Sequence, residues 1–225
     1  MAEPKKIVML GASGAVGGQA LRTLLTQSSV AQITVLVRRD LGLKVSLAGP
    51  HLDQQIVNVL DPASYQALLP GHHTAICTLG VGQPSKVSRE EFLRVDRDAV
   101  LAFGKACKAA GVTHFSLLAA VGVNAKSSFF YAKAKGQLED GLRALKFERL
   151  SLFEPSMILT PENRYGWSQA LLLKLWPKLD ALLQGPLRKY RGVKVEDLGR
   201  AMALDAIYPG SGENTLTWDQ FQDLN

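Results

Sequence analysis

Cysteine and histidine are scarce in this sequence of 225 residues, which has two cysteines and four scattered histidines. Cys77 and Cys107 have neither the spacing of a metal-binding pair nor the density of a disulfide-stabilised scaffold. No two histidines stand four residues apart, as they do on a zinc-binding helix. We therefore expect no metal site and no disulfide framework.

Long hydrophobic runs are missing as well. The apolar run at residues 7–10 is too short for an export signal, and the run at residues 170–183 is interrupted by Lys174, Lys178 and Asp180. We expect no signal peptide and no membrane-spanning helix, and consequently a protein of the reducing cytoplasm.

No segment of the chain concentrates its charge. The formal net charge of +6 favours anionic ligands, but basic residues are spread along the sequence and no stretch resembles a nucleic-acid-binding module. We expect no specific nucleic-acid binding, because a protein that handles a phosphorylated small molecule accounts for the same balance. Hydrophobic residues at 47% and charged residues at 20% are typical of a globular domain with a large core.

Short apolar runs alternate with helical patterns, which predicts βαβ units and a parallel sheet. We expect an α/β protein with a doubly wound parallel sheet (a Rossmann fold), helices on both faces, and one domain over residues 1–225. Proline and glycine become frequent after residue 153, and we interpret residues 155–192 as a small C-terminal substrate-side lobe. The predicted strands are residues 6–10, 32–37, 54–59, 74–78, 114–118 and 148–153, and the predicted helices are residues 15–27, 88–110, 130–145, 167–183 and 195–207.

A glycine-rich turn joins the first predicted strand to the first predicted helix. Gly11 allows a turn that a side chain would strain, Gly14 leaves room for a pyrophosphate, and Gly17 lets the helix pack closely on the strand. The helix amino terminus adds free N–H groups and a partial positive charge. We predict that this turn binds the phosphates of a dinucleotide through Gly11, Ala12, Ser13, Gly14, Ala15 and Val16.

The end of the second predicted strand selects between the two nicotinamide dinucleotides. A carboxylate there binds the adenosine ribose of NAD, whereas arginine accepts the 2′-phosphate of NADP. The strand ends in Arg38 and Arg39, two guanidinium groups that can hold a phosphate, and Asp40 follows them. We favour NADP as the cofactor, with NAD as the alternative in which Asp40 turns onto the ribose.

Two further positions follow predicted strands at the same edge of the sheet. Asp61 precedes Pro62 and can cap a helix there, and a second role is a bond to the adenine amino group. Leu79 and Gly80 follow the fourth strand, where the backbone passes close to a cofactor. We include Asp61, Leu79 and Gly80 among the cofactor-binding residues, with a plain cap and a plain turn as the structural alternatives.

Tyr131 and Lys135 stand four residues apart and share one face of a predicted helix. An ammonium group near a phenol stabilises the phenolate and lowers the pKa of the tyrosine, so that it can exchange a proton nearer neutral pH. We predict that both residues are catalytic, and that both also contact the cofactor through its nicotinamide ribose.

The turn, the arginines and the Tyr-x-x-x-Lys pair together resemble the atypical, extended-like branch of the short-chain dehydrogenase/reductase superfamily, over nearly the whole chain. The segments at residues 95–98, 111–118 and 145–149 are most similar to the group of the Tat-interacting oxidoreductases and their small bacterial relatives. The resemblance implies NADPH binding across the carboxyl ends of the strands, with Tyr131 and Lys135 delivering a proton.

The sequence departs from that family at two places. Ala119-Ala120 stand where the family has a Ser-Ser pair that carries the catalytic serine, so a substrate carbonyl loses a hydrogen bond there. Ser127 and Ser128 are candidate substitutes, with helix capping as the alternative. Glu154-Pro155 replaces the usual Arg-Pro, and Pro155 with Ser156 is expected to line the nicotinamide side of the pocket.

Three functions are compatible with these features. The first is an NADPH-dependent reductase of a small carbonyl compound, in which Tyr131 donates the proton and Lys135 assists. The second is an NADPH-sensing regulatory protein with little turnover, which the alanines at 119 and 120 favour. A nucleotide-sugar epimerase ranks last, because residues 155–192 form a short lobe. The substrate, the reaction direction and the oligomeric state stay open at this point.

Overall fold

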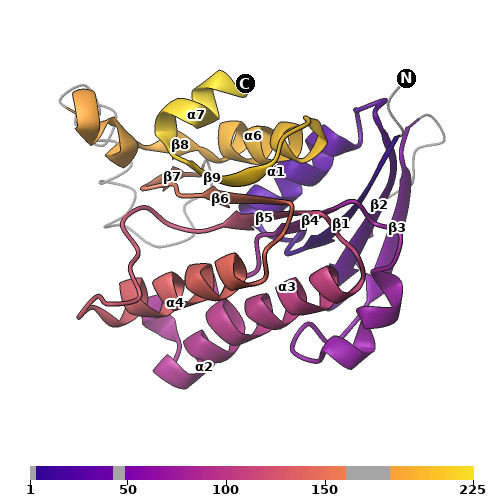
Figure 1. Cartoon of the computed structure of the whole chain (residues 1–225), viewed down its shortest axis with the longest axis horizontal. Coiled ribbons are helices and arrows are strands. Elements are labelled where there is room, and N and C mark those ends of the chain that lie inside the picture. Colours follow the sequence, from indigo (N-terminus) through magenta and orange to yellow (C-terminus); the bar gives the residue numbers. More distant parts are fainter. Residues whose placement is uncertain (1–3, 43–48, 161–182) are drawn as a thin grey trace.

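The structure is a computed structural model of the whole chain that describes residues 4–42, 49–160 and 183–225. Its centre is a seven-stranded, all-parallel sheet in the order β3-β2-β1-β4-β5-β6-β9, with helices on both faces (Figure 1). The order reverses between β1 and β4, so the crevice at the carboxyl ends of these strands is the expected ligand position. The predicted doubly wound Rossmann fold is confirmed.

The sheet strands are β1 (Lys5–Leu10), β2 (Val30–Val37), β3 (His51–Ile56), β4 (Thr74–Cys77), β5 (His114–Leu118), β6 (Arg149–Phe153) and β9 (Gly212–Leu216). The helices are α1 (Ala15–Leu24), α2 (Arg89–Leu93), α3 (Val100–Ala109), α4 (Phe130–Ala144), α6 (Val195–Ile207) and α7 (Trp218–Asp223), with a π-helical segment at Arg94–Ala99 between α2 and α3. Shorter 3-10 turns lie at Pro62–Ser64, Gln66–Leu68, Pro84–Lys86 and Gly185–Tyr190.

Strand β1 shows how the sheet divides the core. Its residues 7–10 are buried, and because successive side chains point to opposite faces, Ile7 and Met9 join one hydrophobic cluster while Val8 and Leu10 join the other. The first cluster lies under α1, α6 and α7, and the second lies under α3 and α4 (Figure 1). Both faces of the sheet are therefore covered, as an all-parallel sheet requires.

Several elements differ from the sequence predictions, among them helix α7, which was not predicted. The strand predicted at residues 54–59 lies earlier, at His51–Ile56, because it is an edge strand with only Leu52 fully buried. Strand β9 was not predicted, since four of its five residues are exposed. The helix predicted at residues 88–110 is helical without a gap over residues 89–109, but a π-helical segment at Arg94–Ala99 separates α2 from α3.

The predicted C-terminal lobe is described only in part. Strands β7 (Ile158–Leu159) and β8 (Val193–Lys194) form a two-stranded parallel sheet, which joins the two ends of this region. Most of the helix predicted at residues 167–183 lies outside the described residues, and the lobe stays a prediction. In the described part of the chain, no helix is both long and apolar enough to cross a membrane.

Candidate functional site

The glycine-rich turn leads from β1 into α1. Its first and last glycines, Gly11 and Gly17, have no space for a side chain. Gly11 has φ +98°, and a Cβ there would lie 2.6 Å from the backbone carbon of Thr78. The Thr78 hydroxyl donates a hydrogen bond of 3.0 Å to the carbonyl oxygen of Gly11, and the N–H of Gly14 donates one of 2.9 Å to the same oxygen. The turn is thereby fixed with the amino terminus of α1 facing the carboxyl end of the sheet, where it favours an anion.

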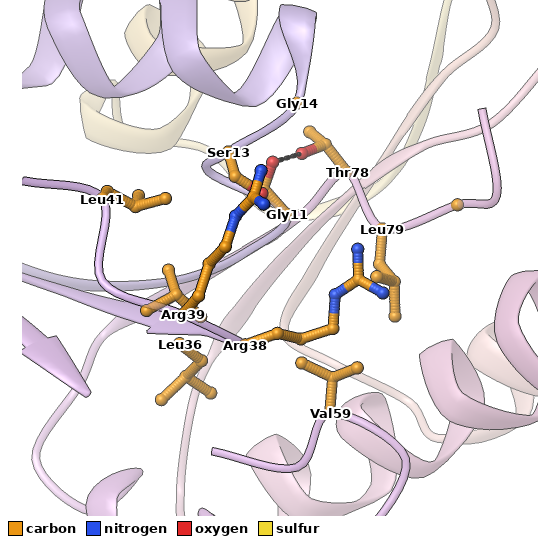
Figure 2. A pocket seen from close by; sticks show the side chains of 12 residues that line it. Gly11, Ser13, Gly14, Leu36, Arg38, Arg39, Leu41, Val59, Thr78 and Leu79 are labelled. Atoms are coloured by element: carbon orange, nitrogen blue, oxygen red, sulfur yellow. Dashed lines mark hydrogen bonds between the residues drawn. The ribbon is translucent and has the colours of Figure 1, made fainter. Parts of the chain in front are cut away.

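A pocket of about 490 Å³ opens beside this turn. Figure 2 shows the side chains of Arg38 and Arg39 extending into it from the end of β2, with Arg39 toward Gly11 and Ser13 and Arg38 toward Val59 and Leu79. We call this space the arginine pocket. Its lining residues are Gly11, Ser13, Gly14, Leu36, Val37, Arg38, Arg39, Leu41, Val59, Thr78, Leu79 and Gly80.

The two arginines carry charge that the described residues leave uncompensated: neither guanidinium forms an ion pair or a side-chain hydrogen bond with them. The nearby carboxylate of Asp40 is engaged elsewhere. Its Oδ1 accepts hydrogen bonds from Gln54 Nε2 at 2.6 Å and from the N–H of Gly42 at 2.8 Å. The Gln54 bond, followed by the Gly42 bond, lowers the pKa of Asp40, so this carboxylate is ionised and held by Gln54. Asp40 is not among the residues that line the arginine pocket.

A second pocket of about 400 Å³ continues from the first. It shares Gly14, Thr78, Leu79 and Gly80 with the arginine pocket and reaches α4, so we call it the tyrosine pocket. Its other lining residues are Ala15, Val16, Gly17, Gly82, Pro84, Asp96, Leu118, Ala119, Tyr131, Lys135, Ser156, Met157, Ile158 and Thr160.

Tyr131 and Lys135 line the tyrosine pocket from α4, but Lys135 has a partner that the sequence did not reveal. Its Nζ lies 2.9 Å from Oδ1 of Asp96, and both side chains are less than a tenth exposed. Tyr131 is 40% exposed, and its ring lies 5.5 Å from that of Phe92. Tyr131 is therefore partly exposed as a residue, while the Lys135 ammonium group is buried.

The predicted lowering of the Tyr131 pKa is wrong in direction. Desolvation of the phenol raises its pKa, and the negative charge of Asp96 raises it further. Lys135 lowers the pKa, as the spacing predicted, but it does not outweigh the desolvation. Tyr131 is consequently a protonated phenol at neutral pH, suited to donating a proton.

Three predicted cofactor-binding residues lie apart from both pockets. Ala12 is buried in the core under α1. Asp61 is exposed, and its carboxylate accepts the N–H of Ala63 at 3.0 Å, which confirms the capping interpretation. Pro155 is buried, and its carbonyl oxygen accepts the N–H of Val121, whereas the adjacent Ser156 does line the tyrosine pocket.

The missing serine has no substitute at the predicted positions. Ala119 lines the tyrosine pocket, whereas Ser127 and Ser128 do not. The Ser127 hydroxyl instead accepts the N–H of Phe129 at 3.1 Å, just before α4 begins. Ser127 therefore forms a local turn ahead of α4, whose N-cap residue is Phe129 and has no side-chain cap. Thr78 and Asp96 are two of the lining residues that sequence analysis missed, because only the fold brings them to the glycine turn and to Lys135.

No group of three or more histidine, cysteine, aspartate or glutamate side chains that could hold a metal ion occurs among the described residues. The described site thus offers the backbone N–H groups of a helix amino terminus, two arginines, a phenol and a buried ammonium group.

Two solved structures share the fold. MoeE5 in complex with UDP-glucose and NAD aligns with a TM-score of 0.68 at 18% identity, covering 94% of this chain and 75% of that one. The Citrobacter sp. triphenylmethane reductase complexed with NADP(H) aligns with a TM-score of 0.62 at 16% identity, covering 95% of this chain and 69% of that one.

Proteins with similar sequences identify the family to which this chain belongs. "Protein HTATIP2" of Rattus norvegicus is 33% identical, and the match covers 94% of this chain and 85% of the relative. "Protein fmp52, mitochondrial" of Emericella nidulans is 28% identical, covering 68% of this chain and 66% of the relative. The family described as NAD(P)H-binding matches residues 11–150. The chain therefore belongs to the NAD(P)H-binding family, and with HTATIP2 to the atypical short-chain dehydrogenase/reductase branch.

Proposed function

We propose that the chain is an NADP(H)-dependent oxidoreductase that reduces a small carbonyl compound. One observation carries the proposal: the arginine pocket and the tyrosine pocket share Gly14, Thr78, Leu79 and Gly80. A single extended dinucleotide can therefore place one end at the two arginines and the other end beside Tyr131 and Lys135.

The residues of the shared wall fit such a ligand. A Cβ on Gly14 would lie 3.2 Å from the carbonyl oxygen of Gly11, so glycine keeps the helix amino terminus open to a pyrophosphate. Gly11, Ser13, Gly14, Ala15 and Val16 line the two pockets, which supports their role as phosphate-binding residues in this proposal. Leu79 and Gly80 would cover the middle of the cofactor from the end of β4.

The preference for NADP rests on Arg38 and Arg39. Two guanidinium groups without partners among the described residues favour a ligand with a doubly charged phosphate. Asp40, the group that would serve NAD, is held by Gln54 and Gly42. Solved structures with this fold include complexes with NAD and a complex with NADP(H), so the fold does not decide between them and the proposed preference rests on these side chains.

The proton chemistry follows from Tyr131 and Lys135. When bound, NADPH supplies the hydride. The Tyr131 hydroxyl donates its proton to the carbonyl oxygen, and the Lys135 ammonium stabilises the tyrosinate that results. Because Tyr131 is 40% exposed, solvent can return the proton.

A second candidate function is an NADPH-responsive regulatory protein with little turnover. This function is favoured by the position of Ala119, which lines the tyrosine pocket where the short-chain dehydrogenase/reductase family has a serine hydroxyl. A substrate carbonyl would then be polarised by Tyr131 with one hydrogen bond fewer, which lowers the rate by orders of magnitude. Both candidates use a small-molecule ligand. Both keep the predicted cytoplasmic location, although the fungal relative is named mitochondrial.

NADPH oxidation across a panel of small aldehydes and ketones separates the two. The reductase proposal expects turnover by the unaltered chain that falls at least ~100-fold in Tyr131→Phe, because the proton donor is lost. Tyr208→Phe is the control, since Tyr208 is half exposed and lies outside both pockets. NADPH binding without turnover that depends on Tyr131 would favour the regulatory function instead.

A further inference from the structure

Asp96 is a buried carboxylate whose two oxygens bind two different elements. It is 5% exposed and lies in the π-helical segment Arg94–Ala99, a conformation that often marks functional positions. Oδ1 lies 2.9 Å from Nζ of Lys135 on α4, and Oδ2 accepts the N–H of Val81 at 2.8 Å. Asp96 therefore links α4 directly to the loop that follows β4.

That loop also forms the wall shared by the two pockets. A Cβ on Gly80 would lie 3.0 Å from Oδ1 of Asp96, so the carboxylate is packed against the loop backbone as well as bonded to it. Leu79 and Gly80 line both pockets. A shift of Asp96 would thus move the pocket wall and the ammonium group together.

A buried ion pair of this kind needs an explanation beyond stability. Desolvation of two charges offsets most of their attraction, and an apolar pair of similar volume often stabilises a fold equally well. Here the charges sit in the tyrosine pocket, where the proposed reaction needs Lys135 at a fixed place and with a controlled field on Tyr131.

We propose that Asp96 is a positioning residue, which holds Lys135 against the loop at residues 79–81 and limits the action of the Lys135 ammonium on Tyr131. The catalytic meaning of this inference rests on the proposed function. The coupling of Asp96 to Tyr131 through Lys135 does not depend on the proposed function.

The direction of that coupling follows from the groups around Tyr131. Among the described residues, the titratable groups that shift the pKa of Tyr131 are Lys135 and Asp96, and both also act on Cys77 of β4. Burial raises the pKa of the Cys77 thiol to about 12, so Cys77 is neutral. Asp96 raises the pKa of Tyr131 and Lys135 lowers it. Removing the charge of Asp96 therefore leaves Lys135 unopposed and lowers the pKa of Tyr131.

Ultraviolet difference titration of the ligand-free protein measures this effect. The phenolate absorbance of Tyr131 is the difference between a given protein and its Tyr131→Phe counterpart. In Asp96→Asn, which keeps the shape of the side chain, we expect the pKa of Tyr131 to fall. Asp98→Asn is the matched control, since Asp98 lies in the same segment but is exposed and pairs with Arg97.

The titration needs neither cofactor nor substrate, so its result stands even if no carbonyl compound is turned over. An unchanged Tyr131 pKa in Asp96→Asn, or the same shift in Asp98→Asn, would overturn the inference. If turnover is found, the alkaline limb of kcat/KM should move to lower pH in Asp96→Asn, because Tyr131 must be protonated to act. A loss of rate with no movement of the limb indicates a structural role alone.

Hydrogen exchange on the unaltered chain covers the case in which Asp96→Asn does not fold. If Asp96 holds the loop, the Val81 amide should exchange at least ~100-fold more slowly than an unstructured amide. Exchange of Val81 at the rate of an unstructured amide would show that the link is not maintained in solution, and the inference would fail.

Discussion

Gly17 lies on α1 where the helix passes over the turn that precedes it. A Cβ at this position would lie 2.5 Å from the Thr78 hydroxyl oxygen and closer still to the carbonyl oxygen of Gly11. These two atoms form the hydrogen bond that fixes the turn. The requirement for glycine at position 17 is therefore steric, and it preserves the geometry of the glycine-rich turn.

Gly17→Ala should weaken NADP binding and lower the free energy of unfolding by about 1–3 kcal/mol, the usual cost of forcing atoms into a packed site. Chemical denaturation and a cofactor titration measure the two effects. Gly18→Ala is the matched control, because its Cβ would meet only the Ala12 carbonyl oxygen at 3.5 Å. Alanine is a better helix former, so Gly18→Ala should raise stability by up to about 1 kcal/mol. Equal losses in both variants would contradict the steric explanation.

Residues that act through local spacing could be predicted from the sequence, and those that act through the fold could not. The glycine turn and the Tyr131–Lys135 pair depend on neighbours within one turn of chain, so spacing identified them. Asp96 meets Lys135 across two helical segments, and the sequence around it has the polar pattern of a surface helix. The held position of Asp40 depends in the same way on Gln54, which β3 brings alongside β2.

At the scale of elements, strands that are buried on both faces of the sheet could be predicted from the sequence, whereas the exposed edge strands could not. Strands β1 and β5 lie in the middle of the sheet, so residues 7–10 of β1 and 114–117 of β5 are buried and mostly apolar. The edge strands carry polar side chains toward solvent, which explains the displaced β3 and the missed β9. The π-helical segment gives no sequence pattern of its own, so α2 and α3 were predicted as one helix.

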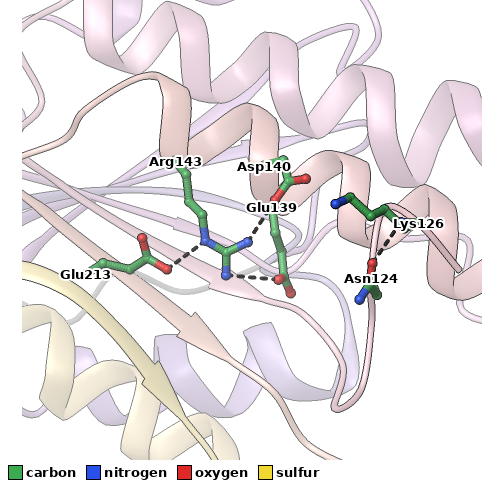
Figure 3. A network of polar contacts seen from close by, with 6 residues as sticks. All are labelled: Asn124, Lys126, Glu139, Asp140, Arg143 and Glu213. Carbon is green, nitrogen blue, oxygen red and sulfur yellow. Dashed lines mark hydrogen bonds and ion pairs between the residues drawn. The ribbon is translucent and has the colours of Figure 1, made fainter.

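Helix α4 carries a second buried charge two turns beyond Tyr131. Glu139 is 3% exposed, and burial, with a further contribution from Glu154, raises its pKa to about 7. Arg143 donates to Oε2 of Glu139 at 3.3 Å and to Glu213 of β9 at 2.7 Å (Figure 3). Oε1 of Glu139 has no hydrogen-bond partner among the described residues. This network connects α4 to the edge strand β9, but it leaves one oxygen of the Glu139 carboxylate without a hydrogen bond among the described residues.

The raised pKa makes stability depend on pH. Between pH 4.5 and about 7 the folded chain retains the proton of Glu139 that the unfolded chain has lost, so this contribution to the free energy of unfolding is lost as pH rises. Urea denaturation at pH 5 and pH 8 should show a decrease of the order of 2–3 kcal/mol from this group, absent in Glu139→Gln. Asp140→Asn, an exposed neighbour on the same arginine, should keep the decrease. A decrease that persists in Glu139→Gln would assign it to other groups.

At the scale of the whole molecule, the site is assembled where the sheet reverses its strand order. The turn after β1, the end of β2, the loop after β4 and helix α4 lie far apart in the sequence, and the parallel sheet brings their functional ends to one edge (Figure 1). The position of this edge could be predicted from strand–helix alternation alone. The continuity of the arginine pocket with the tyrosine pocket could not, because it depends on Thr78 and on the loop that Asp96 holds.

The proposed placement of NADP(H) is the central claim, and equilibrium titration with NADP and NAD tests it most directly. Loss of a charge-assisted bond to phosphate costs about 1.5–3 kcal/mol, or roughly 10- to 100-fold in Kd. We therefore predict that the chain binds NADP more tightly than NAD, and that Arg38→Ala and Arg39→Ala weaken NADP binding by this factor while NAD binding is unchanged. Arg22→Ala, on α1 and outside the arginine pocket, should alter neither affinity. NADP affinity that is unchanged in both Arg38→Ala and Arg39→Ala would contradict the account.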